Sequence, residues 1–403
     1  DPRFTRPITT ISAFYHNWQG RYRDTVDIYE KSVQDVERFP DGQFPLYARL
    51  IVANSYSYIG QVNHALGMLD AIRAHAYDIK YMEIVGYALL YLAHILINAG
   101  RLDDVDQIIA SLPERSVKQY DPRLQALIAQ LKSYFYFHKG QTDNSLHHLK
   151  DYLEINKSEA IIRAPTRFVM EICWAMENGD YPSFDELSLV QEVEAGIDSA
   201  NIFIKGMSLR FKALLDRKKG VPLDSVLKNL QQSESWLKKA GNVLEIAWTR
   251  IEIARTYLHQ ADEKKAAEKA KKAHWTISHF PDLEFPDDLQ FLVTDFSSRD
   301  NLLEEILQFG QDVVTIRNAK DLEKHIILTV NRITGAERGG IFLLKSDAPD
   351  KEFVLRAAKN LTEEEITKPE FAESLEIIRE VASSGKGVIQ KMDLQDKDVF
   401  NSS

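Results

Sequence analysis

A ladder of evenly spaced glycines constrains the fold more than any other feature of this sequence. The glycines are Gly20, Gly60, Gly100, Gly140, Gly179 and Gly220, and Ala261 takes the seventh place, so the steps are 40, 40, 40, 39, 41 and 41 residues. Each follows an apolar helical run and precedes a second one, where glycine can end a helix in the left-handed conformation. Such a period is typical of stacked helical hairpins that bury their apolar faces against their neighbours. We therefore expect a mainly α chain, with an α-solenoid of about seven helix pairs over residues 1–280.

The individual helices follow from apolar residues at helical spacing and from the prolines and glycines between them. Ala266, Ala270 and Ala273 share one helix face and are small enough for close helix contact. The expected pairs are 7–18 with 22–38, 45–59 with 62–75, 82–99 with 102–112, 122–139 with 142–154, 163–178 with 183–195, 199–218 with 222–239, and 242–259 with 263–279.

Composition limits the functions and the cellular location that we expect. A net charge of -10 argues against a general nucleic-acid surface, which needs clustered lysine and arginine. Cys173 is the only cysteine, so no disulfide can form within the chain, and a reducing, cytoplasmic location is expected. No apolar run approaches the roughly 20 residues of a membrane span. The sequence starts without methionine and stops within a pattern, so we expect part of a longer protein.

Aromatic residues stand four positions before the turn in several repeats, as Tyr56, Tyr136 and Tyr257 do. The turn Gly100-Arg101-Leu102 and the small residue Ala65 on a second helix complete the pattern. It resembles tetratricopeptide repeats, in the longer-helix variety of bacterial regulators of the maltose-activator type, because the period is about 40 residues instead of 34. HEAT-like helix pairs share this period and are the alternative.

The character of the sequence changes after the repeats. Residues 281–299 carry two prolines and lose the periodicity, as a linker or a capping segment does. In residues 300–403 we expect helices at 301–316, 321–334 and 373–384 and strands at 340–344, 353–358 and 388–390, hence an α/β domain. The run from Leu322 to Leu344 and the later run from Phe371 to Asp393 resemble a GAF domain. In combination with the run from Arg356 to Asn360 they are similar to GAF domains of bacterial enhancer-binding activators that work with sigma-54. The resemblance implies an incomplete GAF-like sensory domain.

No catalytic constellation is visible. The closest approach to a phosphate-binding loop, residues 384–387, has Glu380 where that motif requires glycine. Cys173 lies in an apolar helix and reads as a buried structural thiol, and His147 and His148 lack metal-ligand spacing. The lysines of residues 264–272 alternate with glutamates, as on a solvated helix face. We expect no enzyme activity, no metal and no cofactor in this chain, and no direct binding of nucleic acid. The complete GAF domain could still hold a small molecule of unknown identity.

Of the twelve positions that lie thirteen, nine, six and two residues before the turn glycines of repeats two to four, nine carry aromatic, amide or imidazole side chains, and Ile51, Leu127 and Leu131 occupy the others. In tetratricopeptide arrays these positions line the concave groove. Rings supply contact area at small entropic cost, and amides bond a peptide backbone. We expect a groove for a protein or peptide partner, unless some of these residues form core between repeats. The groove residues are Tyr47, Asn54, Tyr58, Tyr87, Tyr91, His94, Asn98, Tyr134 and His138.

The helix expected at 301–316 carries an apolar stripe with steps of 4, 3, 4 and 3 residues. This spacing is typical of the seam between two paired helices. We expect it to form a homodimer, or else to pack on the sheet of its own domain. The stripe consists of Leu302, Ile306, Phe309, Val313 and Ile316.

Together these resemblances imply the sensory and protein-interaction region of a bacterial cytoplasmic signalling or transcription regulator. A sigma-54-dependent activator is the first expectation: its repeats would bind a protein partner and its GAF-like part would sense or transmit a signal. The alternatives are the sensor region of a histidine kinase or cyclase, and a plain scaffold whose GAF fold binds nothing.

Overall fold

The protein is mainly helical and divides into two compact units, Asp1–Leu303 and Glu304–Ser403. The computed structural model describes residues 2–33, 45–112, 121–161 and 165–293 of the first unit. In the second it describes residues 322–323, 326–327, 329–330, 336, 338–344, 353–359, 361, 363–368 and 371–387. None of the helices in these ranges combines the length and the apolar character that crossing a membrane requires.

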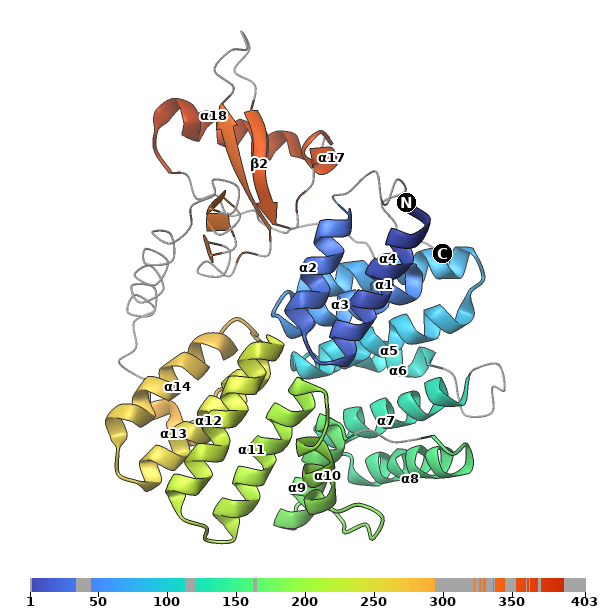
Figure 1. Cartoon of the computed structure of the whole chain (residues 1–403), viewed down its shortest axis with the longest axis vertical. Coiled ribbons are helices and arrows are strands. Elements are labelled where there is room, and N and C mark those ends of the chain that lie inside the picture. Colours follow the sequence, from blue (N-terminus) through green and yellow to red (C-terminus); the bar gives the residue numbers. More distant parts are fainter. Residues whose placement is uncertain are drawn as a thin grey trace. The chain divides into compact units, whose positions relative to one another are not determined.

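The first unit is built from helices that follow one another as antiparallel hairpins (Figure 1). All fourteen predicted helices are present in it. They are α1 (Pro2–Trp18), α2 (Tyr22–Val33), α3 (Leu46–Tyr58), α4 (Val62–Asp78), α5 (Met82–Asn98), α6 (Leu102–Ser111), α7 (Pro122–His138), α8 (Thr142–Ser158), α9 (Arg167–Asn178), α10 (Leu189–Ile197), α11 (Ile202–Lys218), α12 (Leu223–Ala240), α13 (Val243–His259) and α14 (Glu263–Ile277).

The predicted ladder marks the turns inside the hairpins. All seven positions have left-handed φ angles, from +59° at Ala261 to +92° at Gly60. The prediction was wrong at the fifth pair, whose second helix begins at Leu189 and not near residue 183. Pro182 restricts the backbone there, and residues 182–188 form an irregular connection that buries Leu187. The first helix of this pair begins at Arg167, after Thr166 accepts a hydrogen bond from the Val169 amide as N-cap.

One large apolar cluster runs from Val26 to Leu215, and the last helix pair forms a separate cluster with a cap. Ala266, Ala270 and Ala273 are fully buried between α13 and α14, as their spacing predicted. The 3-10 helix η1 (Asp287–Leu292) follows, and Phe285 and Leu289 pack on the same cluster. Of the two alternatives for residues 281–299, the described part, up to residue 293, is therefore a cap on the last helix pair.

The two ends of the array also meet each other. The Ile202 amide at the start of α11 donates to the Gln19 carbonyl in the first turn at 2.9 Å. The Asn201 side chain donates to the Trp18 carbonyl at 2.7 Å. Ala99, in the third turn, packs in one apolar cluster with Leu244 and Phe280. The turns of the first three hairpins thus contact the starts of α11 and α13 and the cap, along what we call the closing seam.

The second unit contains an antiparallel strand pair, β1 (Gly339–Leu344) and β2 (Phe353–Lys359), with α17 (Glu363–Ile366) and α18 (Ala372–Ser384). Ile341 pairs with Ala357 and Phe342 with Leu355, so Arg356 forms a bulge. The predicted strands at 340–344 and 353–358 and the helix at 373–384 are confirmed. The described residues between 322 and 330 are helical, within the helix expected at 321–334. The helix at 301–316, its stripe and the strand at 388–390 lie outside the described residues.

Candidate functional site

The first unit surrounds a partly open cavity of about 300 Å³. Every helix pair contributes to its wall, from Tyr22 in the first pair to Leu244 in the seventh, and Phe280 of the cap completes it. Its polar lining residues are Asn54, Ser57, His94, Asn98, Gln130, Thr166, Arg167, Asn201, Asn242 and Glu245, and its tyrosines are Tyr22, Tyr58, Tyr91 and Tyr134. The closing seam is therefore what brings residues from both ends of the array around one cavity.

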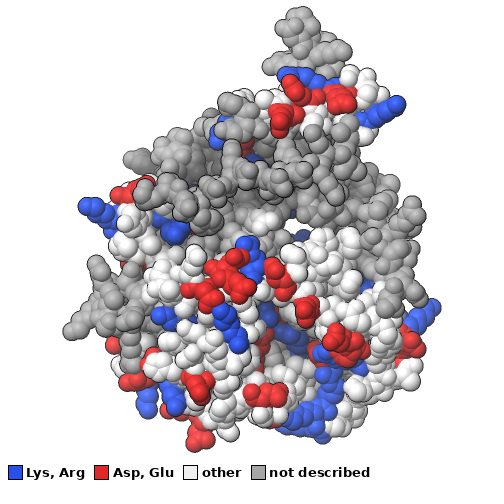
Figure 2. Space-filling view, turned by 180° about the vertical axis from the view of Figure 1, so that it is seen from behind, with Lys and Arg blue, Asp and Glu red and all other residues white. Residues whose placement is uncertain are grey.

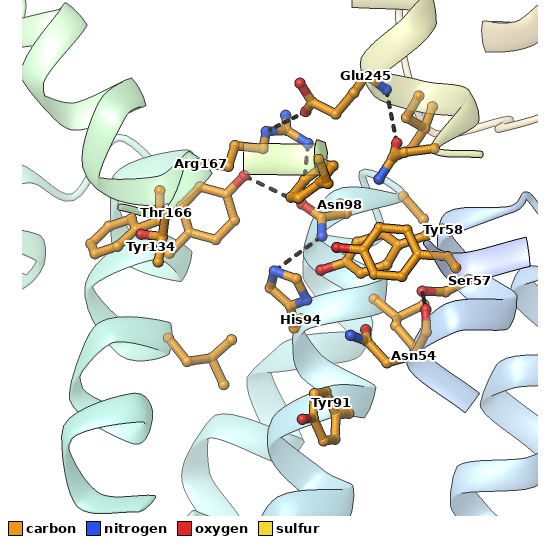
Figure 3. Close-up of a pocket in the computed structure, with 18 of the residues that line it drawn as sticks. Asn54, Ser57, Tyr58, Tyr91, His94, Asn98, Tyr134, Thr166, Arg167 and Glu245 are labelled. Atoms are coloured by element: carbon orange, nitrogen blue, oxygen red, sulfur yellow. Dashed lines mark hydrogen bonds and ion pairs between the residues drawn. The ribbon is translucent and has the colours of Figure 1, made fainter. Parts of the chain in front are cut away.

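One wall is aromatic and joins the two ends of the array. The ring centroids of Tyr22 and Tyr58 lie 4.3 Å apart, and Phe203 from α11 lies 5.6 Å from Tyr22 and 5.5 Å from Tyr58. On another wall Tyr134 and Phe168 meet edge to face at 5.3 Å. Figure 3 shows Tyr58 and Tyr134 on either side of Asn98 and His94. A bound molecule would therefore meet ring surfaces from both halves of the array.

Asn98 is the centre of a polar network between these walls (Figure 3). Its Oδ1 accepts from the Tyr134 hydroxyl and from Arg167 Nη1, each at 3.3 Å. Its Nδ2 lies 3.2 Å from His94 Nε2. An amide nitrogen can only donate, so Nε2 accepts and the imidazole proton sits on Nδ1. Burial, reinforced by the nearby Arg167 charge, lowers the pKa of His94 to about 4, so this ring is neutral at pH 7.

The charges at the cavity form a closed set of ion pairs. Arg167 Nε lies 2.6 Å from Glu171 Oε1 and 3.1 Å from Glu245 Oε1. Glu245 also pairs with Arg210 at 2.5 Å and is almost fully buried. Burial by itself would raise the pKa of Glu171, but Arg167 and then His138 outweigh it and hold this pKa well below its usual range. Two arginines thus balance two glutamates.

Of the nine predicted groove residues, six line the cavity: Asn54, Tyr58, Tyr91, His94, Asn98 and Tyr134. The other three do not. Tyr47 is exposed and stacks on Phe14. Its ring also contacts Tyr87, which is buried. His138 packs edge-on against Tyr134, with Nε2 3.7 Å from Glu171 Oε2. Whether the six bind a partner or serve as core stays a prediction.

The sequence pattern missed Arg167, Phe203 and Glu245. They stand twelve, seventeen and sixteen positions before their turn residues, whereas the groove positions lie at thirteen, nine, six and two. The same offsets applied to the fifth repeat would have found Thr166, which lines the cavity. The three missed residues lie in the first turns of α9, α11 and α13, which the path of the whole array brings inward.

Other side chains considered in the sequence have simpler surroundings. Cys173 is buried in α9, as predicted. His147, His148 and Asp151 bring one possible ligand atom each within 4.8 Å of one another, on a helix face where the sequence predicted no metal. The basic run on α14 forms ion pairs: Lys269 with Glu234, and Lys272 with Glu268. Figure 2 shows acidic and basic side chains interspersed over the described surface in view, with no broad basic field.

Comparison with known proteins gives no relative: neither a protein-family model nor a curated protein matches the chain.

Proposed function

We propose that this chain is the sensory region of a bacterial cytoplasmic signalling or transcription regulator, whose repeat array binds a ligand in its central cavity. The array is interpreted as an α-solenoid of tetratricopeptide type, and the second unit as GAF-like. The 40-residue period and its left-handed turns support the first interpretation, and the order of strands and helices supports the second. The proposal assigns the chain no catalytic step.

The observation that carries the proposal is a single cavity with walls from both ends of the array. Its volume of about 300 Å³ is at the lower end of ligand pockets, which span roughly 300–1,000 Å³. Such a space admits a small molecule or the tip of a peptide and excludes a folded domain. A molecule that contacts both Tyr58 and Phe203 would tie the first pairs to the sixth, so that binding favours the closed array.

The output domain of such a regulator is proposed from the resemblance alone. A sigma-54-type ATPase with a DNA-binding helix-turn-helix is the first choice, and a histidine kinase or cyclase is the second. Pairing of two copies through residues 301–316 is proposed on the apolar stripe in the sequence. A plain scaffold would need no ligand, which separates it from the sensor by experiment.

Binding is tested by thermal unfolding of the whole chain with the small-molecule fraction of a bacterial extract. Saturating ligand should raise the melting temperature by roughly 3–5 °C, because 100-fold excess over Kd contributes about 2.7 kcal/mol and the entropy of unfolding is about 2.1 cal/mol/K per residue. Leu127→Trp fills the cavity and should remove the rise. Val190→Trp is the matched control: Val190 is 38% exposed and Leu127 37%, but only Leu127 lines the cavity. No rise for the wild type, or one that survives Leu127→Trp, would contradict the proposal.

A specific observation favours protein binding as a second function. The outer face of α1 exposes Ile8, Ile11, Tyr15 and Trp18, each more than half exposed, at steps of 3, 4 and 3 residues. Contiguous apolar side chains on one helix face are typical of a contact with another helix. This face lies outside the cavity lining, so the two functions are compatible.

A further inference from the structure

The charges, hydrogen-bonding groups and rings of the cavity define the chemistry of its ligand. We infer that the cavity binds an uncharged small molecule with a planar, amide-bearing or heteroaromatic ring, and that it rejects ions of either sign. This inference rests on the proposed function of the cavity as a ligand site, and it adds the class of ligand.

The charged side chains of the lining neutralise one another, so an ionic ligand meets no net charge. Among the described residues that line the cavity, only Arg167 and Glu245 are charged, and they pair with each other at 3.1 Å. Each also has a second partner, Glu171 or Arg210. An anion or cation would have to break a buried pair or enter unpaired, and both alternatives carry a large desolvation cost.

The remaining titratable groups of the cavity lining are neutral at pH 7. His94 is unprotonated, as its low pKa requires. Burial raises the pKa of the Tyr22, Tyr58 and Tyr91 hydroxyls, so these groups keep their protons. The cavity therefore offers hydroxyl, imidazole and amide groups, which hydrogen-bond neutral molecules without attracting ions.

The amide groups and aromatic rings of the lining indicate which kind of neutral molecule fits. Asn54 Oδ1 is buried and accepts no hydrogen bond from the described residues, so it is available to a ligand N–H after a small adjustment. Gln130 adds a second amide side chain to the wall, and the aromatic clusters of Tyr58 and Tyr134 supply apolar ring contact. A planar ring with an amide-like edge matches both features.

Benzamide, benzoate and benzamidine test this inference, because the three probes have nearly the same shape and carry charges of 0, −1 and +1. Their dissociation constants are measured on the full chain at pH 7 by ligand-observed NMR. Benzamide should bind at least about tenfold more tightly than either ion, a difference of about 1.4 kcal/mol. Leu127→Trp should abolish its binding, and Val190→Trp should leave it unchanged.

A charge introduced without a change of size sharpens the test. Gln130 Nε2 donates to Thr166 Oγ1 at 2.9 Å, and in Gln130→Glu the threonine hydroxyl can donate instead. This variant should shift the preference toward benzamidine by tenfold or more, because the wall then carries an uncompensated negative charge.

The outcomes separate the ligand class from the function. If benzoate or benzamidine binds the wild type as tightly as benzamide, the inferred class is wrong but the cavity remains a ligand site. If no probe binds while the extract still raises the melting temperature in a Leu127-dependent way, the class is likewise overturned. If the extract also has no effect, the proposed function itself fails.

Discussion

The six turn glycines have the same place in the sequence pattern, but five of them fall into two distinct groups in the folded protein, and a Cβ on the sixth, Gly60, would lie 3.2 Å from Val243 Cγ2. A Cβ atom on Gly20 would lie 2.8 Å from the Phe203 nitrogen, and one on Gly100 would lie 2.8 Å from the Asp282 carbonyl carbon. At Gly140, Gly179 and Gly220 the same atom would meet nothing within 4 Å. The first group faces the closing seam, and the second faces open space. A local signal can therefore place a turn without revealing what the turn touches.

The largest expected effect comes from replacing these glycines with alanine, both at the closing seam and away from it. All four variants Gly20→Ala, Gly100→Ala, Gly140→Ala and Gly220→Ala force alanine into a left-handed turn, which costs about 1–2 kcal/mol. The first two also overpack the seam, which adds about 1–3 kcal/mol. Urea unfolding followed by circular dichroism should show the free energy of unfolding falling by roughly 2–5 kcal/mol for Gly20→Ala and Gly100→Ala. Equal losses in all four would mean that the seam contributes nothing.

A second prediction uses pH to report closure. The pKa of His94 is about 4 in the folded chain and 6.5 for an unburied histidine, so only the unfolded chain takes up a proton between these values. The free energy of unfolding should therefore be unaffected above pH 6.5 and fall by about 3 kcal/mol as the pH drops from 6.5 to 4. His94→Gln should remove this part of the loss. The pKa of Glu171 is lowered instead, so its contribution is lost only below about pH 4.5.

The same histidine distinguishes the two groups of glycines. If Gly100→Ala opens the seam, water reaches His94 and NMR should show its pKa rising toward 6.5, whereas Gly140→Ala should leave it near 4. His148 is an internal reference, since burial and the nearby Lys132 lower its pKa to about 4 at a site outside the cavity lining. A His94 pKa that stays near 4 in Gly100→Ala would place its burial in the local helices and not in closure.

The smallest expected effect separates a helix cap at the seam from a cap elsewhere. Asn201 accepts from the Phe203 and Ile204 amides and also donates across the seam to Trp18. Asp262 caps α14 through the Lys265 amide, without a contact to the seam. Asn201→Ala should cost about 2 kcal/mol and Asp262→Ala less, measured as shifts of the urea midpoint. Asn201→Ala combined with Gly20→Ala should cost less than the sum, because both disrupt one contact.

Much of the fold was predictable because it is encoded locally. Apolar spacing gave the helices, and glycines gave the turns, since both depend on residues within a few positions of one another. The start of α10 was predicted wrongly because the apolar residues after Pro182 are compatible with a helix as well as with an irregular connection. Part of the cavity lining could be predicted. In α3, α5 and α7 the lining residues stand at the same distances in sequence from the turn glycines, and these distances identified residues such as Tyr91 and Asn98.

By itself the sequence determined the repeat, the helix pairs and the polar, tyrosine-rich inner faces of the first half. Only the tertiary structure decided that these faces surround one cavity, that Arg167 and Glu245 meet there at 3.1 Å, and that Gly100 is confined while Gly140 is free. The physical reason is that closure depends on the packing angle between successive helix pairs. Each angle is set by many side-chain contacts, and their sum over seven pairs brings Gln19 to Ile202, a relation that no local pattern contains.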